Sequence, residues 1–343
     1  MSSIELFQNE KPSEETYWRS IILFGNNVAS YKFALAESLI EIIPTGRSSI
    51  TLEELAEPYT RYICAHIAQA PRQTTSNSSE FLSTCDKFNK GLTSKDELIS
   101  TAVKLGFNNV IDAFHNVNGS QIPVSFYEKD YTKGHKRIIL TDEIYKLQGV
   151  DVYENLTKEA EARWKLVETS WNLRISRNLL NVKYDGENEV LFVDKNLERK
   201  DVTSARSALN GYQKGKCFYC YDNISIVEGS ENLCDVDHFF PHVLQKYIHF
   251  ANLDGVWNLV LACVPCNRGE DGKFARRPHI KYLERLAKRN EFLISSHHPL
   301  RETLMQQTGK TYQDRENFYR QAYKESEILG STWTMEQRGE ATF

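Results

Sequence analysis

Apolar residues recur every three or four positions between about residues 15 and 115, which is the spacing of one face of an α-helix. One of these runs opens with Thr51 and Glu54, a pair suited to cap the first turn of a helix. The pattern predicts a mostly helical N-terminal domain, which we bound at residues 1–180. Its last element is a long amphipathic helix over residues 156–181.

Residues 95–147 depart from the purely helical pattern. Two short helical runs are followed by two strand-like runs, 122–127 and 137–140, on either side of the basic turn Lys133–Lys136. Two helices followed by a hairpin with a basic tip are typical of a winged-helix-like DNA-binding element. A plain α+β packing unit has the same pattern, so both interpretations stay open.

The second half of the chain mixes strand and helix patterns. A hairpin that turns at Asp185-Gly186 is predicted in the linker 181–200. Helical spacing returns after Pro278, so residues 281–343 are predicted to form a C-terminal helical segment. The fold class that follows is α+β.

The composition changes this picture in two ways. No apolar run is long enough to cross a bilayer, and the acidic start of the chain lacks the layout of a signal peptide, so we expect a cytoplasmic protein without a membrane partner. The net charge of −4 argues against a wholly cationic nucleic-acid binder.

Positive charge is nevertheless concentrated in one segment. Between Cys266 and Asn290 there are eight lysines and arginines against three acidic residues. A phosphodiester substrate is attracted by such a cluster, although a solvated helix face can have the same composition. The candidate nucleic-acid-binding residues within it are Lys273, Arg276, Arg277 and Lys281.

Four of the seven cysteines form two Cys-x-x-Cys pairs, Cys217 with Cys220 and Cys263 with Cys266. Two intervening residues let both thiolates of a pair turn toward one ion at tetrahedral angles. Two such pairs predict a closed structural Zn²⁺ site. The odd number of cysteines in a long chain favours a reduced compartment over a disulfide framework.

Several polar residues accompany these cysteines. Asp237-His238-Phe-Phe-Pro241 and Trp257-Asn258-Leu-Val lie between the two pairs, and Asn267 directly follows the last cysteine. This constellation resembles the HNH endonuclease motif, in an H-N-N form because Asn267 stands where many members have histidine. The resemblance covers about residues 200–280 and implies a zinc-stabilised ββα-metal nuclease domain at 201–280.

The resemblance also implies a role for each of four residues. His238 would be the general base, since a neutral imidazole can take a proton from the attacking water. Asp237 and Asn267 would hold a catalytic Mg²⁺ or Mn²⁺ through oxygen atoms. Asn258 would hydrogen-bond across the loop and hold His238 in place.

These roles imply a metal-dependent endonuclease that hydrolyses phosphodiester bonds, with DNA as the expected substrate. Stand-alone proteins of this kind often serve in prokaryotic restriction or anti-phage defence, some with a partner ATPase. The N-terminal domain would then serve target choice, homodimerisation or docking to such a subunit. Two alternatives stay open: an RNase or toxin nuclease acting on RNA, and a zinc-stabilised nucleic-acid-binding module without catalysis.

Overall fold

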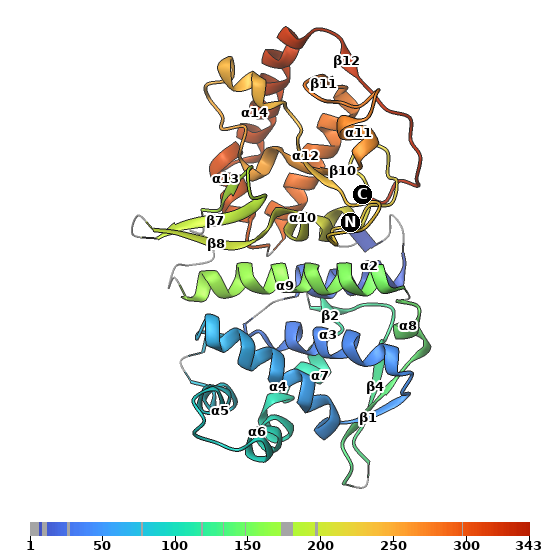
Figure 1. The fold of residues 1–343 in the computed structure, drawn as a ribbon, viewed down its shortest axis with the longest axis vertical. Helices are drawn as coiled ribbons and strands as arrows, with labels where there is room; N and C mark the ends of the chain where they lie inside the picture. Colours follow the sequence, from blue (N-terminus) through green and yellow to red (C-terminus); the bar gives the residue numbers. More distant parts are fainter. Residues whose placement is uncertain are drawn as a thin grey trace. The chain divides into compact units, whose positions relative to one another are not determined.

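The chain forms two compact units, an N-terminal unit of residues 12–175 and a C-terminal unit of residues 176–343 together with residues 1–11. Both units contain helices and strands, which confirms the predicted α+β class (Figure 1). Among the described residues, no helix is both long and apolar enough to cross a bilayer. The computed structural model describes residues 7–8, 12–25, 28–76, 78–117, 119–132, 134–147, 149–172, 181–195, 198–296 and 298–343.

The N-terminal unit is built mainly from helices (Figure 1). The predicted cap of α4 is confirmed, because the Thr51 hydroxyl accepts from the Glu54 N–H at 3.2 Å and the Glu54 carboxylate accepts from the Thr51 N–H at 2.9 Å. The helical elements are α2 (Glu14–Phe24), α3 (Tyr31–Ile42), η1 (Ile43–Thr45), α4 (Leu52–Gln69), α5 (Glu80–Asn89), α6 (Lys95–Thr101), the π-helical turn η2 (Ala102–Gly106), α7 (Val110–Ala113), α8 (Asp142–Tyr145) and α9 (Val150–Asn172).

Helix α9 begins earlier than the predicted range of 156–181. Its first turn carries Asp151, whose negative charge is favourable at a helix N-terminus. Residues 173–180 of the predicted range lie outside the described residues, and residue 181 is not helical. In the core of the unit the fully buried Trp164 of α9 stacks on Phe33 of α3, with ring centroids 5.8 Å apart.

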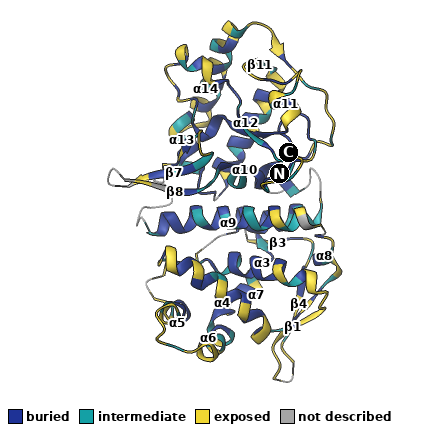
Figure 2. Cartoon of the chain, in the orientation of Figure 1, coloured by how far each residue is buried: buried dark blue, intermediate teal, exposed yellow. Residues whose placement is uncertain are grey.

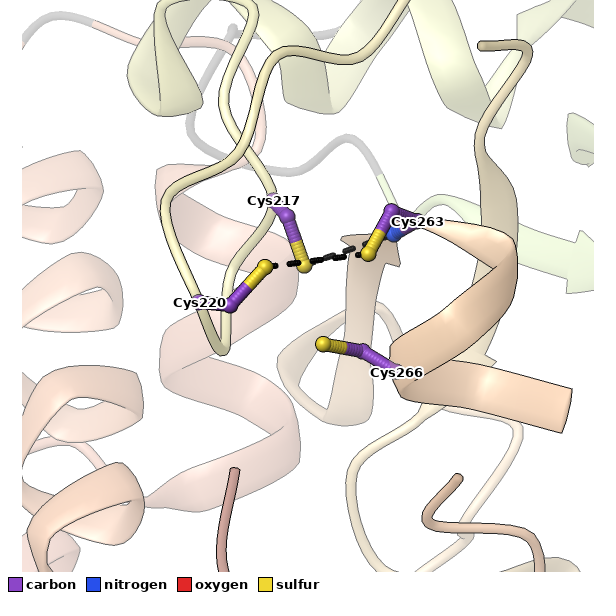
Figure 3. A group of neighbouring side chains, drawn as sticks. All are labelled: Cys217, Cys220, Cys263 and Cys266. Atoms are coloured by element: carbon purple, nitrogen blue, oxygen red, sulfur yellow. Dashed lines mark hydrogen bonds between the residues drawn. The ribbon is translucent and has the colours of Figure 1, made fainter. Parts of the chain in front are cut away.

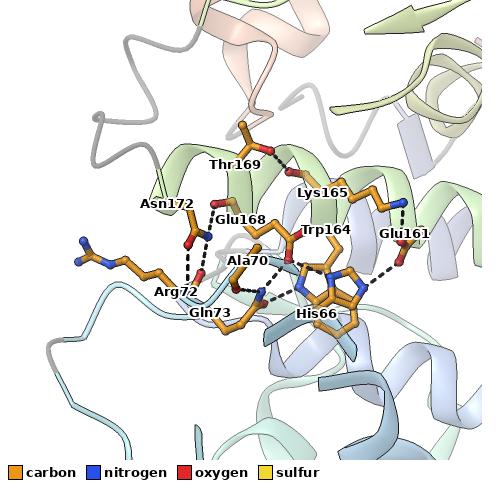
Figure 4. Close-up of polar contacts among 10 residues, drawn as sticks. All are labelled: His66, Ala70, Arg72, Gln73, Glu161, Trp164, Lys165, Glu168, Thr169 and Asn172. Carbon is orange, nitrogen blue, oxygen red and sulfur yellow. Dashed lines mark hydrogen bonds and ion pairs between the residues drawn. The ribbon is translucent and has the colours of Figure 1, made fainter. Parts of the chain in front are cut away.

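A buried charged network joins α4 to α9 (Figure 4). His66 places Nε2 at 2.9 Å from Glu161 and Nδ1 at 2.8 Å from Glu168, and its ring stacks on Trp164 at 3.5 Å. Carboxylates only accept hydrogen bonds, so both ring nitrogens carry protons and the imidazole is charged. Burial opposes this charge, but the hydrogen bonds to the two glutamates raise the pKa of His66 to about 9.

The strands of the N-terminal unit form an antiparallel sheet of order β1 (Ser49–Thr51), β5 (Arg137–Leu140) and β4 (Tyr127–Asp130), beside a two-stranded β2 (Asn116–Val117) and β3 (Ser120–Gln121). The strand predicted at 122–127 is therefore displaced, since only its last residue belongs to β4. Pro123 has no N–H to donate to a ladder. Lys133, in the predicted basic turn, lies outside the described residues, and the winged-helix interpretation stays a prediction.

The C-terminal unit opens with the predicted hairpin. Strand β6 (Lys183–Asp185) pairs antiparallel with β7 (Val190–Lys195), and β8 (Glu198–Ser204) extends the sheet. The remaining elements are α10 (Ala205–Gln213), β9 (Asp235–His238), η4 (His242–Lys246), η5 (Val256–Asn258), β10 (Leu259–Ala262), α11 (Val264–Arg268), β11 (Arg277–Pro278), α12 (Ile280–Ser295), α13 (Arg301–Thr308), α14 (Tyr312–Glu325), η6 (Ser326–Leu329) and β12 (Thr332–Trp333).

Helix α12 of this unit buries one face and exposes the other (Figure 2). Tyr282 and Leu286 have no exposed surface, and the Tyr282 ring stacks on Trp333 of β12 with centroids 5.7 Å apart. The Tyr219 ring packs edge-on against both of these rings. The C-terminal helical region and the segment of the cysteine pairs therefore share one core.

Candidate functional site

The candidate site is built on a strand–strand–helix element. Strand β9 pairs antiparallel with β10, with His238 opposite Leu259 and Asp237 opposite Val260. Helix α11 begins directly after β10, and Cys263 is its N-cap residue. All four residues of β10 are fully buried, because the run Leu-Val-Leu-Ala is apolar on both faces of the strand. The hairpin thus anchors the polar residues of β9 to the core.

The four cysteines of the two pairs come together and are all buried (Figure 3). Their sulfur atoms lie within 4.8 Å of one another, and the Sγ atoms of Cys220 and Cys263 are 3.7 Å apart. A tetrahedral site with Zn–S bonds of about 2.3 Å has sulfur–sulfur edges of about 3.8 Å. All seven cysteines of the chain are described, and none forms a disulfide. The donor set therefore fits a structural metal ion such as zinc.

The two cysteine pairs reach this cluster from different kinds of backbone. The first pair lies in a turn that closes with Tyr221 in the left-handed region, at φ 61°, where its N–H donates to the Cys217 carbonyl. The second pair spans the first turn of α11. An ion bound to all four thiolates would join this turn to the helix, and Asn267 is the next residue along that helix.

His238 is held by a carboxylate that the sequence pattern did not indicate. Its Nε2 lies 2.9 Å from Oδ1 of Asp254. Because a carboxylate only accepts, Nε2 carries the proton and Nδ1 retains the lone pair. Burial lowers the pKa of His238, while Asp254 and Asp237 act in the opposite direction. The imidazole is thus kept neutral near neutral pH and can accept a proton at Nδ1.

Asp237 is buried between two donors. The Tyr219 hydroxyl donates to its Oδ2 at 2.5 Å, and Nζ of Lys273 lies 3.1 Å from its Oδ1. Burial raises the pKa of Asp237, and the charge of Lys273 and the bond from Tyr219 oppose this rise. Two of the roughly four lone-pair positions of the carboxylate are used by these donors, which leaves others for a cation.

The position of Lys273 corrects one prediction. It was expected to contact a phosphate, but its side chain has no exposed surface. Its ammonium group also donates to the carbonyls of His238 at 2.9 Å and Phe274 at 3.1 Å. A side chain enclosed in this way cannot reach a phosphate outside, so we assign Lys273 to the support of Asp237.

Asn267 is oriented by Asp235, a second carboxylate that the sequence analysis missed. Its Nδ2 donates to Oδ2 of Asp235 at 3.0 Å, so its amide oxygen faces away from that carboxylate and can bind a cation. Asp235 and Asp237 lie two residues apart in β9 and therefore share one face of the strand. The alternation Asp-x-Asp-His was the pattern that could have indicated Asp235.

Asn258 lies beneath the loop and has no exposed surface. Its Nδ2 donates to the carbonyls of Phe240 at 2.9 Å and Leu253 at 2.8 Å, and its Oδ1 accepts from the Phe240 N–H at 2.8 Å. These bonds join the end of β9 to the loop that carries Asp254. Asn258 thus joins Phe240, which follows His238, to Leu253, which precedes Asp254.

The basic residues near the site are only partly available to a ligand. Arg276 and Lys281 are exposed, but the Arg276 guanidinium donates to the Gly272 carbonyl and the Lys281 ammonium lies over the Tyr282 ring, 4.9 Å from its centroid. The guanidinium of Arg277 stacks on the Tyr323 ring, 4.1 Å from its centroid. Arg289, a further member of the charged run, is buried and donates to backbone carbonyls of η5 and β10. A count of charges along the sequence therefore overestimates the basic surface.

The described residues thus place a neutral imidazole and a buried carboxylate on β9 and an amide on α11, and α11 begins at the second cysteine pair of the four-thiol cluster. No protein-family model, curated protein or solved structure matches the chain. The chemistry of the site is therefore inferred from its own residues.

Proposed function

We propose that the chain is a metal-dependent HNH endonuclease that hydrolyses phosphodiester bonds, with DNA as its substrate. The observation that supports this best is the placement of Asp237, His238 and Asn267 on the element formed by β9, β10 and α11. Hydrolysis of a phosphodiester needs a base for the attacking water and positive charge at the phosphate. His238 can act as the base, and Asp237 and Asn267 can hold a cation that places positive charge at the phosphate.

His238 would act as the general base through Nδ1. Its Nε2–H is already bound to Asp254 at 2.9 Å, so that carboxylate stabilises the positive charge that forms when the imidazole takes a proton from water. A general base in such a position typically contributes a rate factor of about 10²–10⁴. Asn258 would maintain the geometry by fixing the loop on both sides of the pair.

Asp237 and Asn267 would hold a Mg²⁺ or Mn²⁺ ion through oxygen atoms, as such hard ions prefer. The bound ion supplies stabilisation of negative charge on the phosphate and on the leaving oxygen. Lys273 would keep the buried Asp237 carboxylate ionised, and Asp235 would keep the Asn267 oxygen turned outward. A zinc ion on the four cysteines would fix the start of α11, and with it Asn267.

A cleavage assay on supercoiled plasmid tests this proposal. We expect nicking or linearisation with Mg²⁺ or Mn²⁺ and none without a divalent ion. Parallel reactions with single-stranded DNA and structured RNA distinguish DNA from RNA as the substrate. Cleavage that needs no divalent ion would contradict the assigned chemistry, and cleavage of RNA alone would identify an RNase.

One observation favours the second candidate, a nucleic-acid-binding module without catalysis. The buried ammonium of Lys273 lies 3.1 Å from Asp237 and compensates its negative charge, so this carboxylate can be stable without a bound metal ion. Calorimetric titration with Mn²⁺ separates the two candidates. The nuclease requires a binding event that Asn267→Ala weakens, whereas the binding module shows DNA affinity without any such ion site.

A further inference from the structure

The Phe274 side chain is unusual in both its exposure and its backbone. More than half of its surface, 54%, is exposed, although phenylalanine is normally buried. Its φ is +45°, in the left-handed region that residues with a side chain rarely adopt. A ring with this exposure buries little apolar surface in the core, and strained residues of this kind are concentrated at functional sites.

The turn that carries Phe274 is bound to the backbone of Asn267 and is linked to Asp237 through Lys273. Its N–H donates to the Asn267 carbonyl at 2.9 Å. Its carbonyl accepts at 3.1 Å from the ammonium of Lys273, which also lies 3.1 Å from Asp237. The ring therefore projects from a backbone whose position is set by the candidate site itself.

Other left-handed residues of the C-terminal unit have side-chain contacts that explain their positions. Tyr221 is buried and donates to the Phe343 carbonyl at 3.0 Å. Lys214 donates to the Phe7 carbonyl at 2.6 Å, and Glu189 pairs with Arg206 at 2.5 Å. Within the described part of the chain, no aromatic ring or cation packs against the ring of Phe274.

We propose that Phe274 is a nucleobase-binding residue, whose ring stacks on an unpaired DNA base next to the phosphate to be cleaved. This rests on the proposed nuclease function and adds the substrate form, DNA that is single-stranded at the cleavage site. Arg276, two residues further on, is also exposed. Its guanidinium donates to the Gly272 carbonyl, and its remaining N–H groups would bind the adjoining phosphate. An exposed aromatic ring beside a cation is the usual combination in proteins that bind single strands, and it tolerates any base.

The test is the affinity of the full chain for labelled single-stranded and duplex oligonucleotides, measured by fluorescence anisotropy. All variants carry His238→Ala so that the DNA stays intact. Phe274→Ala should weaken single-strand binding by about 5- to 150-fold, the range that corresponds to loss of one stacked base, and duplex binding much less. Phe274→Trp should retain the affinity. Tyr312→Ala, which removes another exposed aromatic side chain of the same unit, should leave it unchanged.

Equal affinities of the parent and Phe274→Ala for single strands would overturn the proposal, as would equal losses on both DNA forms. A structural role is tested separately with Phe274→Gly, which removes the ring and suits a positive φ. Base binding predicts an unchanged or higher melting temperature together with lost single-strand affinity. A lower melting temperature with retained affinity would assign the ring to the fold.

These outcomes are independent of the nuclease test. If the plasmid is cleaved through His238 but Phe274→Ala binds single strands normally, the nuclease stands and the base contact fails. If binding depends on Phe274 but no DNA or RNA is cleaved, the base contact stands and the nuclease fails.

Discussion

Replacing Lys273 by methionine removes one partner of a fully buried ion pair. The Lys273 side chain has no exposed surface and Asp237 is 7% exposed, so solvent cannot take the place of the lost ammonium group. Loss of one member of a buried pair typically costs about 3–5 kcal/mol, because the remaining charge stays uncompensated. We expect a loss of this size in the free energy of unfolding. The exposed Lys281→Met is the matched control, with an expected change of about 0.5 kcal/mol or less.

The pH dependence of this loss follows from the carboxyl group left behind. Burial already raises the pKa of Asp237, and removing Lys273 takes away the main opposing charge, so the pKa of this carboxyl rises further. A folded state with a raised carboxyl pKa binds protons more tightly than the unfolded state. The loss of stability in Lys273→Met is therefore complete above the pKa of Asp237 in the folded variant. It decreases as the pH falls toward the pKa that Asp237 has in the unfolded chain. The variant should differ less from wild type at about pH 5 than at about pH 8.

Divalent ions should partly replace the missing charge if Asp237 is a metal ligand. At 100 times its Kd, a bound ion stabilises the folded state by about 2.7 kcal/mol. Urea unfolding of wild type, Lys273→Met and Lys281→Met at about pH 5 and pH 8, each with and without Mg²⁺, measures the loss, its pH dependence and the effect of the ion. A loss below about 1 kcal/mol in Lys273→Met would refute the buried pair. A normal loss that Mg²⁺ does not reduce would refute the assignment of Asp237 as a metal ligand.

Three other changes test separate parts of the account. Asp254→Asn should slow single-turnover cleavage by about 10- to 100-fold with little loss of DNA affinity, because a carboxylate no longer holds the proton of His238 at Nε2. Asp254→Glu should recover part of the rate, and an unchanged rate in Asp254→Asn would count against the pairing of His238 with Asp254. Cys263→Ser should abolish zinc binding and folding of the C-terminal unit, as measured by metal analysis and circular dichroism, and a soluble variant with a normal melting transition would argue against a structural zinc. The charged His66 has a pKa of about 9, so its contribution to stability is complete below its unfolded value of about 6.5 and is lost as the pH rises through about 9. The melting temperature of wild type should accordingly fall more steeply over that pH range than that of His66→Gln, and parallel curves would contradict the assignment.

The features that the sequence predicted correctly depend on neighbouring residues. Two Cys-x-x-Cys pairs indicate a shared ion because their spacing alone sets the direction of the thiols, and the structure brings the four sulfurs within 4.8 Å. The hairpin at Asp185-Gly186 and the cap at Thr51 were predictable for the same reason. In the hairpin and the cap the interacting groups are a few residues apart, and local backbone geometry decides the outcome. In the cysteine cluster the spacing sets only each pair, and the tertiary fold joins Cys220 to Cys263 across 43 residues.

The features that were missed depend on tertiary structure. Asp254 reaches His238 from a loop 16 residues further on, and no repeating pattern marks that contact. Lys273 counted as one of several basic residues, because sequence charge does not distinguish a buried ammonium from an exposed one. The strand predicted at 122–127 was a local error, since Pro123 in its interior argued against a ladder there.

The central claim is that His238 takes the proton from the attacking water at a metal-dependent nuclease site. Single-turnover cleavage of supercoiled plasmid in Mg²⁺ or Mn²⁺, by wild type and His238→Ala with equal zinc content, tests it most directly. The account predicts that His238→Ala is slower by about 10²–10⁴-fold while its melting temperature and zinc content are unchanged. Equal cleavage rates for the two proteins would contradict it.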